Sequence, residues 1–178
     1  LKISKKVELK EENKSISIEP TDDSFNVKFT LSYDNPLIKN QTNEVNFKGS
    51  DLKEIYSART FCLFEDIEKV KKLGLAKGGS LDNAVVVQGK KILNKSGLRC
   101  EKEFVNHKIL DLAGDFMLAG FRVIGSVKCL HGGHSLTNSF LRKIFSDKSN
   151  FHITEDRKIS VKNIRSVEPT QKRLAVNA

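Results

Sequence analysis

The sequence contains few cysteines, and no two of them are close enough in the chain to form a common metal-binding or redox motif. Among its 178 residues the cysteines are Cys62, Cys100 and Cys129, and there is no Cys-x-x-Cys motif. An odd number of widely spaced cysteines is typical of free thiols in a reducing compartment. We therefore expect a cytoplasmic protein whose metal sites, if it has any, are not built from thiolates.

Long hydrophobic runs are also missing. No stretch approaches the roughly 20 apolar residues that a transmembrane helix needs, and the first ten residues, LKISKKVELK, lack the apolar segment of a secretory signal. We therefore expect at most peripheral membrane association. The content of 38% hydrophobic and 30% charged residues is that of a folded globular chain, and the length suits one ordinary domain.

The chain is basic, with a net charge of +9. Residues 153–178 hold six Lys and Arg against three acidic residues, and elsewhere the basic residues are interleaved with acidic ones. A basic protein attracts phosphate groups of any kind. However, no stripe combines basic and aromatic residues, so a solvated surface is favoured over a nucleic-acid-binding face, and no nucleic-acid partner is expected.

The first fifty residues have the period of β-strands. Hydrophobic and polar positions alternate from Phe25 to Tyr33, and VELKEENKSISIEP predicts two strands around a polar turn. Helical patterns come later in the chain, and a Gly stop follows two of them. The predicted helices cover 51–57, 65–73, 101–119 and 134–145.

Strands that come first and helices that come later argue for an α+β fold. We expect a two-layer sandwich, in which a mainly antiparallel sheet packs on two main helices, 101–119 and 134–145. One βαβ-like piece near 59–93 predicts a small insert. The expected organisation is one domain over 1–150 and a basic C-terminal tail of unknown function over 151–178.

A polar stripe runs along the predicted helix 101–119. His107, Asp111 and Asp115 recur at every fourth residue, opposite the hydrophobic face of the helix. Phe104 and Leu118 lie on the same stripe, with Gly114 beside it. We therefore expect this second face to be covered as well, by something that approaches closely at Gly114.

The stripe has two possible readings. A His and an Asp four residues apart place both donors on one side of a helix, the arrangement that zinc motifs such as HExxH use. Most such pairs are simple surface salt bridges. Nearby in the sequence, HGGHS at 131–135 marks a helix start, where His134 beside a carboxylate would be a general acid or base. A capping turn with incidental histidines is the alternative.

Three segments resemble a known family. They are SARTFCLFEDIEKVKKLGLAKGGSLDNAVVV, LNKSGLRCEKEFVNHKILDLAGDFMLAG and GGHSLTN. They are similar to UDP-3-O-acyl-N-acetylglucosamine deacetylase, the zinc amidase of lipid A (lipopolysaccharide) biosynthesis in Gram-negative bacteria. The similarity runs from near Leu1 to about Phe145 and covers the second half of the family's sequence. It implies Zn²⁺ as cofactor and UDP-3-O-acyl-N-acetylglucosamine as substrate.

The resemblance implies roles for individual residues. His107 and Asp111 would be zinc ligands. Asp115 would orient and charge His134, which would protonate the leaving amine or stabilise the oxyanion. Thr60 would help to hold the oxyanion.

The resemblance also implies substrate contacts. Lys108 would contact the nucleotide phosphates. Leu63 stands where the family frequently has an aromatic residue, and His131-Gly132 stands where it usually has Lys-Ser. The residues that would line a hydrophobic passage for the acyl chain are Phe61, Leu63, Ile67, Ala76, Leu81 and Val86.

One part of the family's chemistry is not in the sequence. In the family, a Glu-His dipeptide in the first half supplies the general base and the third zinc ligand, and this chain contains no such dipeptide. The expectation is therefore a C-terminal half that is inactive without the N-terminal domain of the same enzyme. The alternative is a catalytically silent domain that binds a UDP-sugar, an acyl chain or another protein. Retention of the whole residue set favours the half-enzyme.

Overall fold

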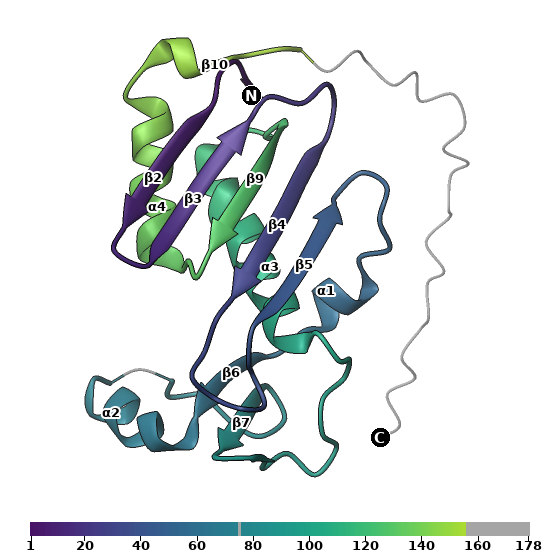
Figure 1. The fold of residues 1–178 in the computed structure, drawn as a ribbon, viewed down its shortest axis with the longest axis vertical. Coiled ribbons are helices and arrows are strands. Elements are labelled where there is room, and N and C mark those ends of the chain that lie inside the picture. Colours follow the sequence, from purple (N-terminus) through teal and green to yellow (C-terminus); the bar gives the residue numbers. More distant parts are fainter. Residues whose placement is uncertain (75, 156–178) are drawn as a thin grey trace, which may run out of the picture.

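A five-stranded sheet forms one layer of the molecule (Figure 1). The computed structural model describes residues 1–74 and 76–155. The strand order is β2-β3-β9-β4-β5; β4 and β9 are parallel, and the other neighbours are antiparallel. The mainly antiparallel sheet is thus confirmed. Its strands are β2 (Val7–Glu11), β3 (Lys14–Glu19), β4 (Phe25–Leu31), β5 (Gln41–Asn46) and β9 (Gly125–Leu130).

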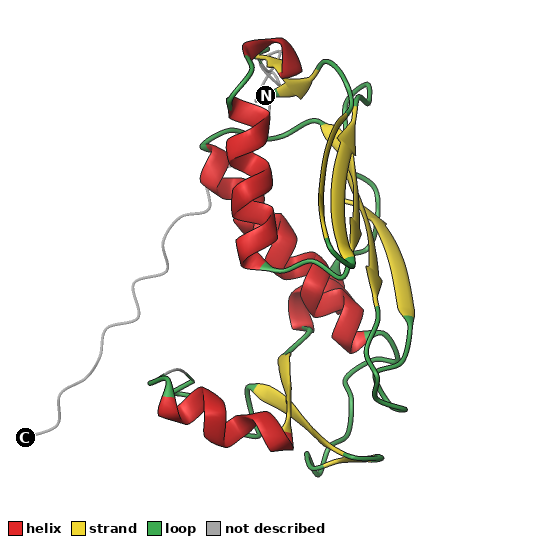
Figure 2. Ribbon diagram, turned by 60° about the vertical axis from the view of Figure 1, so that its left-hand side comes forward, coloured by secondary structure: helices red, strands yellow, loops and turns green. Residues whose placement is uncertain are grey.

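Two long helices form the second layer and cover one face of the sheet (Figure 2). They are α3 (Glu103–Phe116), which a 3-10 turn extends over Met117–Ala119, and α4 (His134–Phe145). The chain leaves α3 at Gly120 with φ +71°, a left-handed conformation that glycine adopts without a Cβ penalty. This arrangement confirms the predicted two-layer α+β sandwich. The short helix α1 (Lys53–Ser57) precedes α3.

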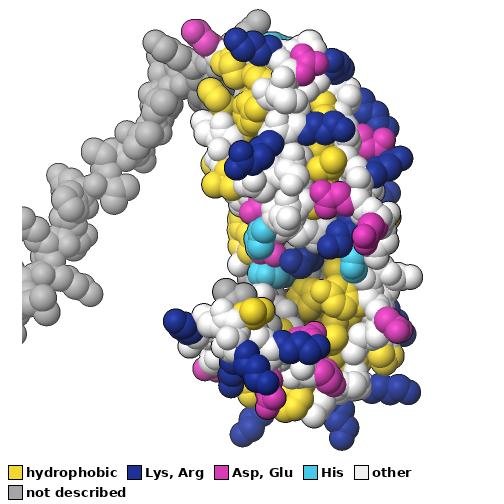
Figure 3. Space-filling model, turned by 90° about the vertical axis from the view of Figure 1, so that its left-hand side faces the viewer, with side chains coloured by type: hydrophobic (Ala, Val, Ile, Leu, Met, Phe, Trp, Pro, Cys, Tyr) yellow, Lys and Arg dark blue, Asp and Glu magenta, His cyan; other side chains and the backbone are white. Residues whose placement is uncertain are grey.

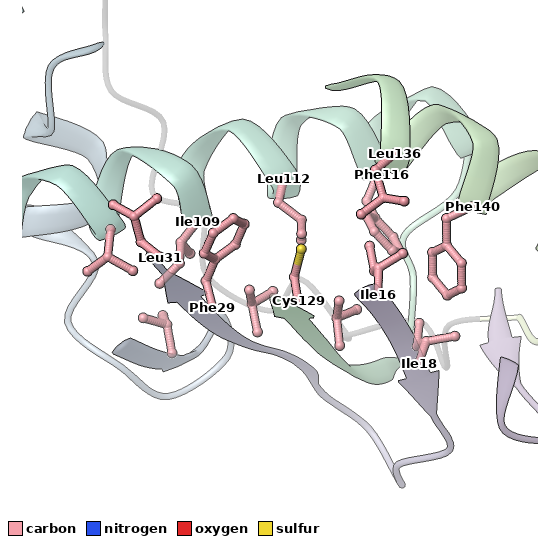
Figure 4. Close-up of a cluster of buried hydrophobic side chains, with 14 of the residues drawn as sticks. Ile16, Ile18, Phe29, Leu31, Ile109, Leu112, Phe116, Cys129, Leu136 and Phe140 are labelled. Carbon is pink, nitrogen blue, oxygen red and sulfur yellow. The ribbon is translucent and has the colours of Figure 1, made fainter. Parts of the chain in front are cut away.

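The core lies between the sheet and the buried faces of both helices (Figure 4). Strand pairing places Ile16 opposite Cys129, and Phe29 lies opposite Cys129 on the other side. All three side chains are buried, so they form one row across three strands. Burial raises the pKa of the Cys129 thiol to about 12, which makes it a neutral core residue. The helices contribute Ile109, Leu112, Phe116, Leu136 and Phe140.

A small βαβ unit, called here the insert, lies at one end of the sandwich (Figures 1 and 2). Its first strand pairs in parallel with β7, and a helix connects the two, as predicted for residues 59–93. Val85 and Val87 of β7 belong to the main core, so the insert is packed onto the sandwich. Its elements are β6 (Thr60–Leu63), a 3-10 turn (Phe64–Asp66), α2 (Ile67–Lys72), β7 (Ala84–Gln88) and β8 (Lys91–Ile92).

The described fold extends slightly past residue 150. After a 3-10 turn (Lys148–Asn150), β10 (Phe151–His152) pairs antiparallel with β1 (Lys2–Ile3). Most of the basic tail expected over 151–178 falls on 156–178, outside the described residues. Within the described part of the chain, every helix is too short or too polar to cross a membrane.

Candidate active site

The polar stripe on α3 is longer than the sequence analysis recognised. Glu103 precedes His107, Asp111 and Asp115 at the same four-residue spacing, and residues four apart lie above one another on a helix. Glu103 is fully buried, and the other three side chains are mostly buried. The four side chains therefore form one continuous row that is largely shielded from water.

His107 and Asp111 form the centre of this row. His107 Nε2 lies 3.3 Å from Asp111 Oδ1, and Lys108 Nζ donates a hydrogen bond of 2.8 Å to Asp111 Oδ2. Burial lowers the pKa of His107 more than the neighbouring carboxylate raises it. His107 is thus neutral near pH 7, the form in which imidazole binds metal ions.

The other ring nitrogen of His107 is left without a good partner. Its Nδ1 is buried and makes no hydrogen bond of ordinary geometry, although the backbone of Ala58 is close enough to favour the protonated ring. Buried polar atoms without a hydrogen-bond partner are uncommon in folded proteins.

His134 pairs with the next carboxylate along the stripe. Its Nδ1 lies 2.9 Å from Asp115 Oδ1 and 3.0 Å from Oδ2. A carboxylate only accepts hydrogen bonds, so Nδ1 is the donor. The ring is 69% exposed, and its Nε2 lies 4.0 Å from Asp111 Oδ2. His134 is therefore anchored at one nitrogen and can exchange protons at the other, beside His107 and Asp111.

The loop before α4 shows why two glycines precede His134. A Cβ at Gly132 would lie 2.4 Å from Cys129 Sγ, so the backbone can pass over the core only without a side chain. Gly133 is the N-cap of α4, and the space around it is open. His131, which precedes them, has a φ of +52° and stacks at a tilt on Tyr33. The Gly-Gly pair thus brings α4, and His134 at its first turn, to Asp115.

A hydrophobic cavity of about 770 Å³ lies within the insert. Five of the six residues predicted for the acyl passage line it, and so does Thr60. The exception is Leu63, which packs against the main core. Lining residues that the sequence analysis did not name include Cys62, Lys71, Ser80 and Asn83. The predicted residues that line the cavity are Phe61, Ile67, Ala76, Leu81 and Val86.

Phe61 joins this cavity to the polar stripe. Its ring packs edge-on against Phe104 at 5.0 Å between centroids and against His107 at 6.4 Å. The cover expected over Phe104 is therefore supplied by the insert. Figure 3 shows histidine and lysine or arginine side chains gathered where the insert meets the sandwich, next to a hydrophobic surface.

The opposite end of the stripe is open. Leu118 is 71% exposed, and a Cβ at Gly114 would meet nothing within 4 Å. The sequence predicted a close approach at Gly114, and no part of residues 1–74 and 76–155 makes it.

Arg59 and Glu103 form a buried ion pair that the sequence analysis missed. Arg59 Nε donates to Glu103 Oε1 at 2.8 Å, and Nη2 donates to Oε2 at 3.0 Å. Burial alone would raise the pKa of Glu103, but the hydrogen bonds from Arg59 and from the backbone of Arg99 outweigh it and lower the pKa. The signal that could have revealed Glu103 is the four-residue period, which continues back from His107.

His107 and Asp111 supply two of the donors that a metal ion needs. Within residues 1–74 and 76–155, no group of three or more His, Cys, Asp or Glu side chains is arranged to hold one. His107 and Asp111 fit two positions of a tetrahedral site. Ligand atoms about 2.0–2.2 Å from zinc are roughly 3.3–3.6 Å apart, and these two are separated by 3.3 Å.

Comparison with known proteins agrees with the pattern of residues. A sequence model of UDP-3-O-acyl N-acetylglycosamine deacetylase matches residues 1–146. The chain belongs to this family. Both long helices and the insert lie inside the matched region.

Several curated deacetylases of this family are similar to the chain, and all are named UDP-3-O-acyl-N-acetylglucosamine deacetylase. The Helicobacter pylori (strain ATCC 700392 / 26695) protein is 40% identical over 154 residues, which is 86% of this chain and 52% of the relative. The Hahella chejuensis protein is 41% identical over 156 residues (86% and 51%). The Myxococcus xanthus protein is 42% identical over 159 residues (89% and 50%). The chain thus spans about half the length of these relatives.

Proposed function

We propose that this chain is the C-terminal half of a cytoplasmic, zinc-dependent amidase. The complete enzyme would hydrolyse the acetamide of UDP-3-O-acyl-N-acetylglucosamine, the committed step of lipid A biosynthesis. The observation that carries the proposal is the pairing of His134 with Asp115 beside His107 and Asp111. A family member without catalytic function would have no chemical need to keep these four groups together.

His107 and Asp111 would hold the metal. Their spacing suits two ligands, and the lowered pKa of His107 keeps its ring in the binding form. Bound zinc supplies an acidified water and polarises the amide carbonyl. A third ligand and a general base are needed, and we assign both to the N-terminal half of the enzyme.

His134 would be the general acid. The Nδ1 bond to Asp115 fixes the orientation and the tautomer of the ring. A proton at Nε2 can then pass to the departing glucosamine nitrogen, which leaves poorly without it. Thr60 lines the cavity, and its hydroxyl would stabilise the oxyanion of the tetrahedral intermediate.

The substrate would occupy two neighbouring regions. The acyl chain would enter the hydrophobic cavity of the insert, where apolar walls favour its burial. The nucleotide diphosphate would be attracted by Lys108, whose ammonium group lies beside Asp111. Phe61 lies between these regions, since it lines the cavity and packs against His107, so the amide of the substrate would lie at the polar stripe.

The partner of this chain would be the N-terminal domain of the same enzyme. The end of α3 carries exposed hydrophobic side chains, Met117 and Leu118, and Phe121 follows them. A groove of about 510 Å³ lies beside them and is bordered by Gly114. Exposed apolar clusters commonly mark interfaces, and the chain spans half of its relatives. These features support docking of the missing half at this surface.

The experiment that tests the proposal joins this chain to an N-terminal half that carries a Glu-His dipeptide. Acetate release from the UDP-sugar substrate is then measured with and without a zinc chelator. Chelator-sensitive release of acetate is expected. Binding of the acylated substrate without acetate release would favour the alternative, a silent binding domain, for which the cavity is the supporting observation.

A further inference from the structure

One buried carboxylate connects α3 to the chain segments that flank the insert on either side. Glu103 Oε1 accepts hydrogen bonds from the backbone N–H of Arg59 at 3.1 Å and from Arg59 Nε at 2.8 Å. Its Oε2 accepts from Arg59 Nη2 at 3.0 Å and from the backbone N–H of Arg99 at 2.7 Å. Arg59 Nη2 also donates to the carbonyl of Gly97 at 2.8 Å. We call these four residues the clamp.

The clamp lies directly beside the proposed chemistry. Arg59 is covalently followed by Thr60, and Glu103 precedes His107 by one helical turn. Phe61, which follows Thr60 in the chain, packs against His107. A shift of Arg59 relative to Glu103 would therefore move Thr60 relative to His107.

Stability alone does not explain such a clamp. Glu103 is fully buried and the Arg59 side chain is 4% exposed, so both charges have lost their water. A buried ion pair usually adds no more stability than apolar residues of the same size would. Four hydrogen bonds to one carboxylate instead fix orientation in several directions at once, which apolar packing does not.

We propose that Glu103 and Arg59 are positioning residues of the deacetylation reaction, which set the place of Thr60 relative to His107 and Asp111. The inference rests on the proposed function. It assigns the clamp a role in the transition state, because Thr60 would act on the oxyanion. The acyl cavity lies within the insert and would move with it, so substrate binding would depend little on the clamp.

The test uses the complete enzyme, with this chain joined to its N-terminal half. Glu103→Asp keeps the charge but withdraws the carboxylate by one methylene group, about 1.5 Å. A displacement of that size can cost on the order of 10²-fold in rate. We expect kcat to fall by about 10- to 100-fold, while KM stays within about 3-fold and zinc content is unchanged. If Glu103→Asp does not fold, Arg59→Lys is used, which keeps the positive charge but loses the paired hydrogen bonds of the guanidinium group to the two carboxylate oxygens of Glu103.

A double-mutant cycle separates positioning from general destabilisation. In a Thr60→Val background, Glu103→Asp should lower kcat much less than it does in the unmodified enzyme, because the group it positions is gone. The control is Val27→Ala, a buried change in β4 that removes core packing and should leave kcat unaltered. Equal losses of kcat in both backgrounds would overturn the inference. Absence of acetate release by the unmodified complete enzyme would instead refute the proposed function.

Discussion

His134 Nδ1 lies within 3.0 Å of both carboxylate oxygens of Asp115, although the two residues come from different helices. The contact leaves Nε2 free and aims the ring toward Asp111. Two separate features of the sequence produce it: the four-residue period of α3 and the Gly-Gly pair before α4. An imidazole held in this way can transfer a proton at Nε2, and histidines that bind metals are held in the same way, so the zinc content of variants is needed to separate the two roles.

The first prediction follows from that contact. In the complete enzyme, His134→Ala should lower kcat by roughly 10²–10⁴, the usual range for a positioned acid or base. KM should change less, because the interaction strengthens mainly in the transition state. Asp115→Asn should also lower kcat, since it removes the carboxylate that holds the His134 ring in its orientation and tautomer. Zinc content should survive both changes, whereas His107→Ala should lose the metal.

His134 could be a general acid or a zinc ligand, and measurement of zinc stoichiometry together with kcat discriminates between these two roles. If His134→Ala loses zinc as readily as His107→Ala does, then His134 is a ligand and the roles proposed here are wrong.

The second prediction concerns the chain by itself. It should bind zinc weakly and release no acetate, because two ligands hold the ion poorly and no base is present. Isothermal titration with zinc measures the first point, and an acetate assay measures the second. Addition of a fragment with the Glu-His segment should restore turnover. Turnover by the isolated chain would contradict the account of the missing base.

The docking surface can be tested in the same complementation assay. Leu118→Asp should raise the fragment concentration needed for half-maximal activity by tenfold or more, since it places a charge in an apolar interface. Leu73→Asp is a matched control, because Leu73 is 73% exposed and lies on the insert. Equal effects of the two changes would place the interface elsewhere.

Much of the fold could be predicted from local patterns. The period of the segment Phe25–Leu31 is that of a strand with one buried face, and α4 begins and ends at the predicted residues. The hydrophobic pattern predicts only a short strand, VNF at 45–47, whereas β5 covers Gln41–Asn46, because its polar first residues pair with β4 at the edge of the sheet. Pairing with a neighbour, which leaves no mark on local hydrophobicity, decided that boundary.

The candidate site was only partly predictable. His107, Asp111 and Asp115 share one helix, so their spacing was sufficient to place them together. Glu103 was missed because its partner, Arg59, lies 44 residues away and the pair forms only when the insert folds onto α3. Leu63 was expected in the passage but is not among the residues that line the cavity; it packs against the core, as does Phe61, two residues earlier on the same face of β6.

The third prediction tests the acyl cavity with Val86, which lines it. Val86→Phe should narrow the cavity and lower kcat/KM for long-acyl substrates by roughly 5- to 150-fold, the equivalent of about 1–3 kcal/mol of overpacking. Substrates with short acyl chains should be hydrolysed nearly as before. The comparison is Leu63→Ala, which should lower thermal stability but leave acyl-chain preference unchanged. A shift of preference in Leu63→Ala would return Leu63 to the passage.

The fourth prediction concerns acid stability. The pKa of Glu103 is lower in the folded chain than its ordinary value of about 4.3. The charged carboxylate therefore stabilises the fold above about pH 4.3, and this contribution is lost as the pH falls from there through the folded-state pKa. Glu103→Gln leaves Arg59 buried without its counter-charge, so it should cost about 3–5 kcal/mol at pH 7.

Urea unfolding of both proteins between pH 7 and pH 3 measures this contribution. The stability difference between the wild-type chain and Glu103→Gln should be constant from pH 7 to about pH 5 and should shrink as the pH falls further, because wild-type Glu103 is progressively protonated. Glu44→Gln is the control: Glu44 is an exposed partner of Lys28 at 3.7 Å, and its loss should change the unfolding free energy by no more than about 0.5 kcal/mol. A Glu103→Gln difference that stays constant down to pH 3 would mean that the charge of Glu103 does not stabilise the fold, and that its shape alone holds the insert on α3.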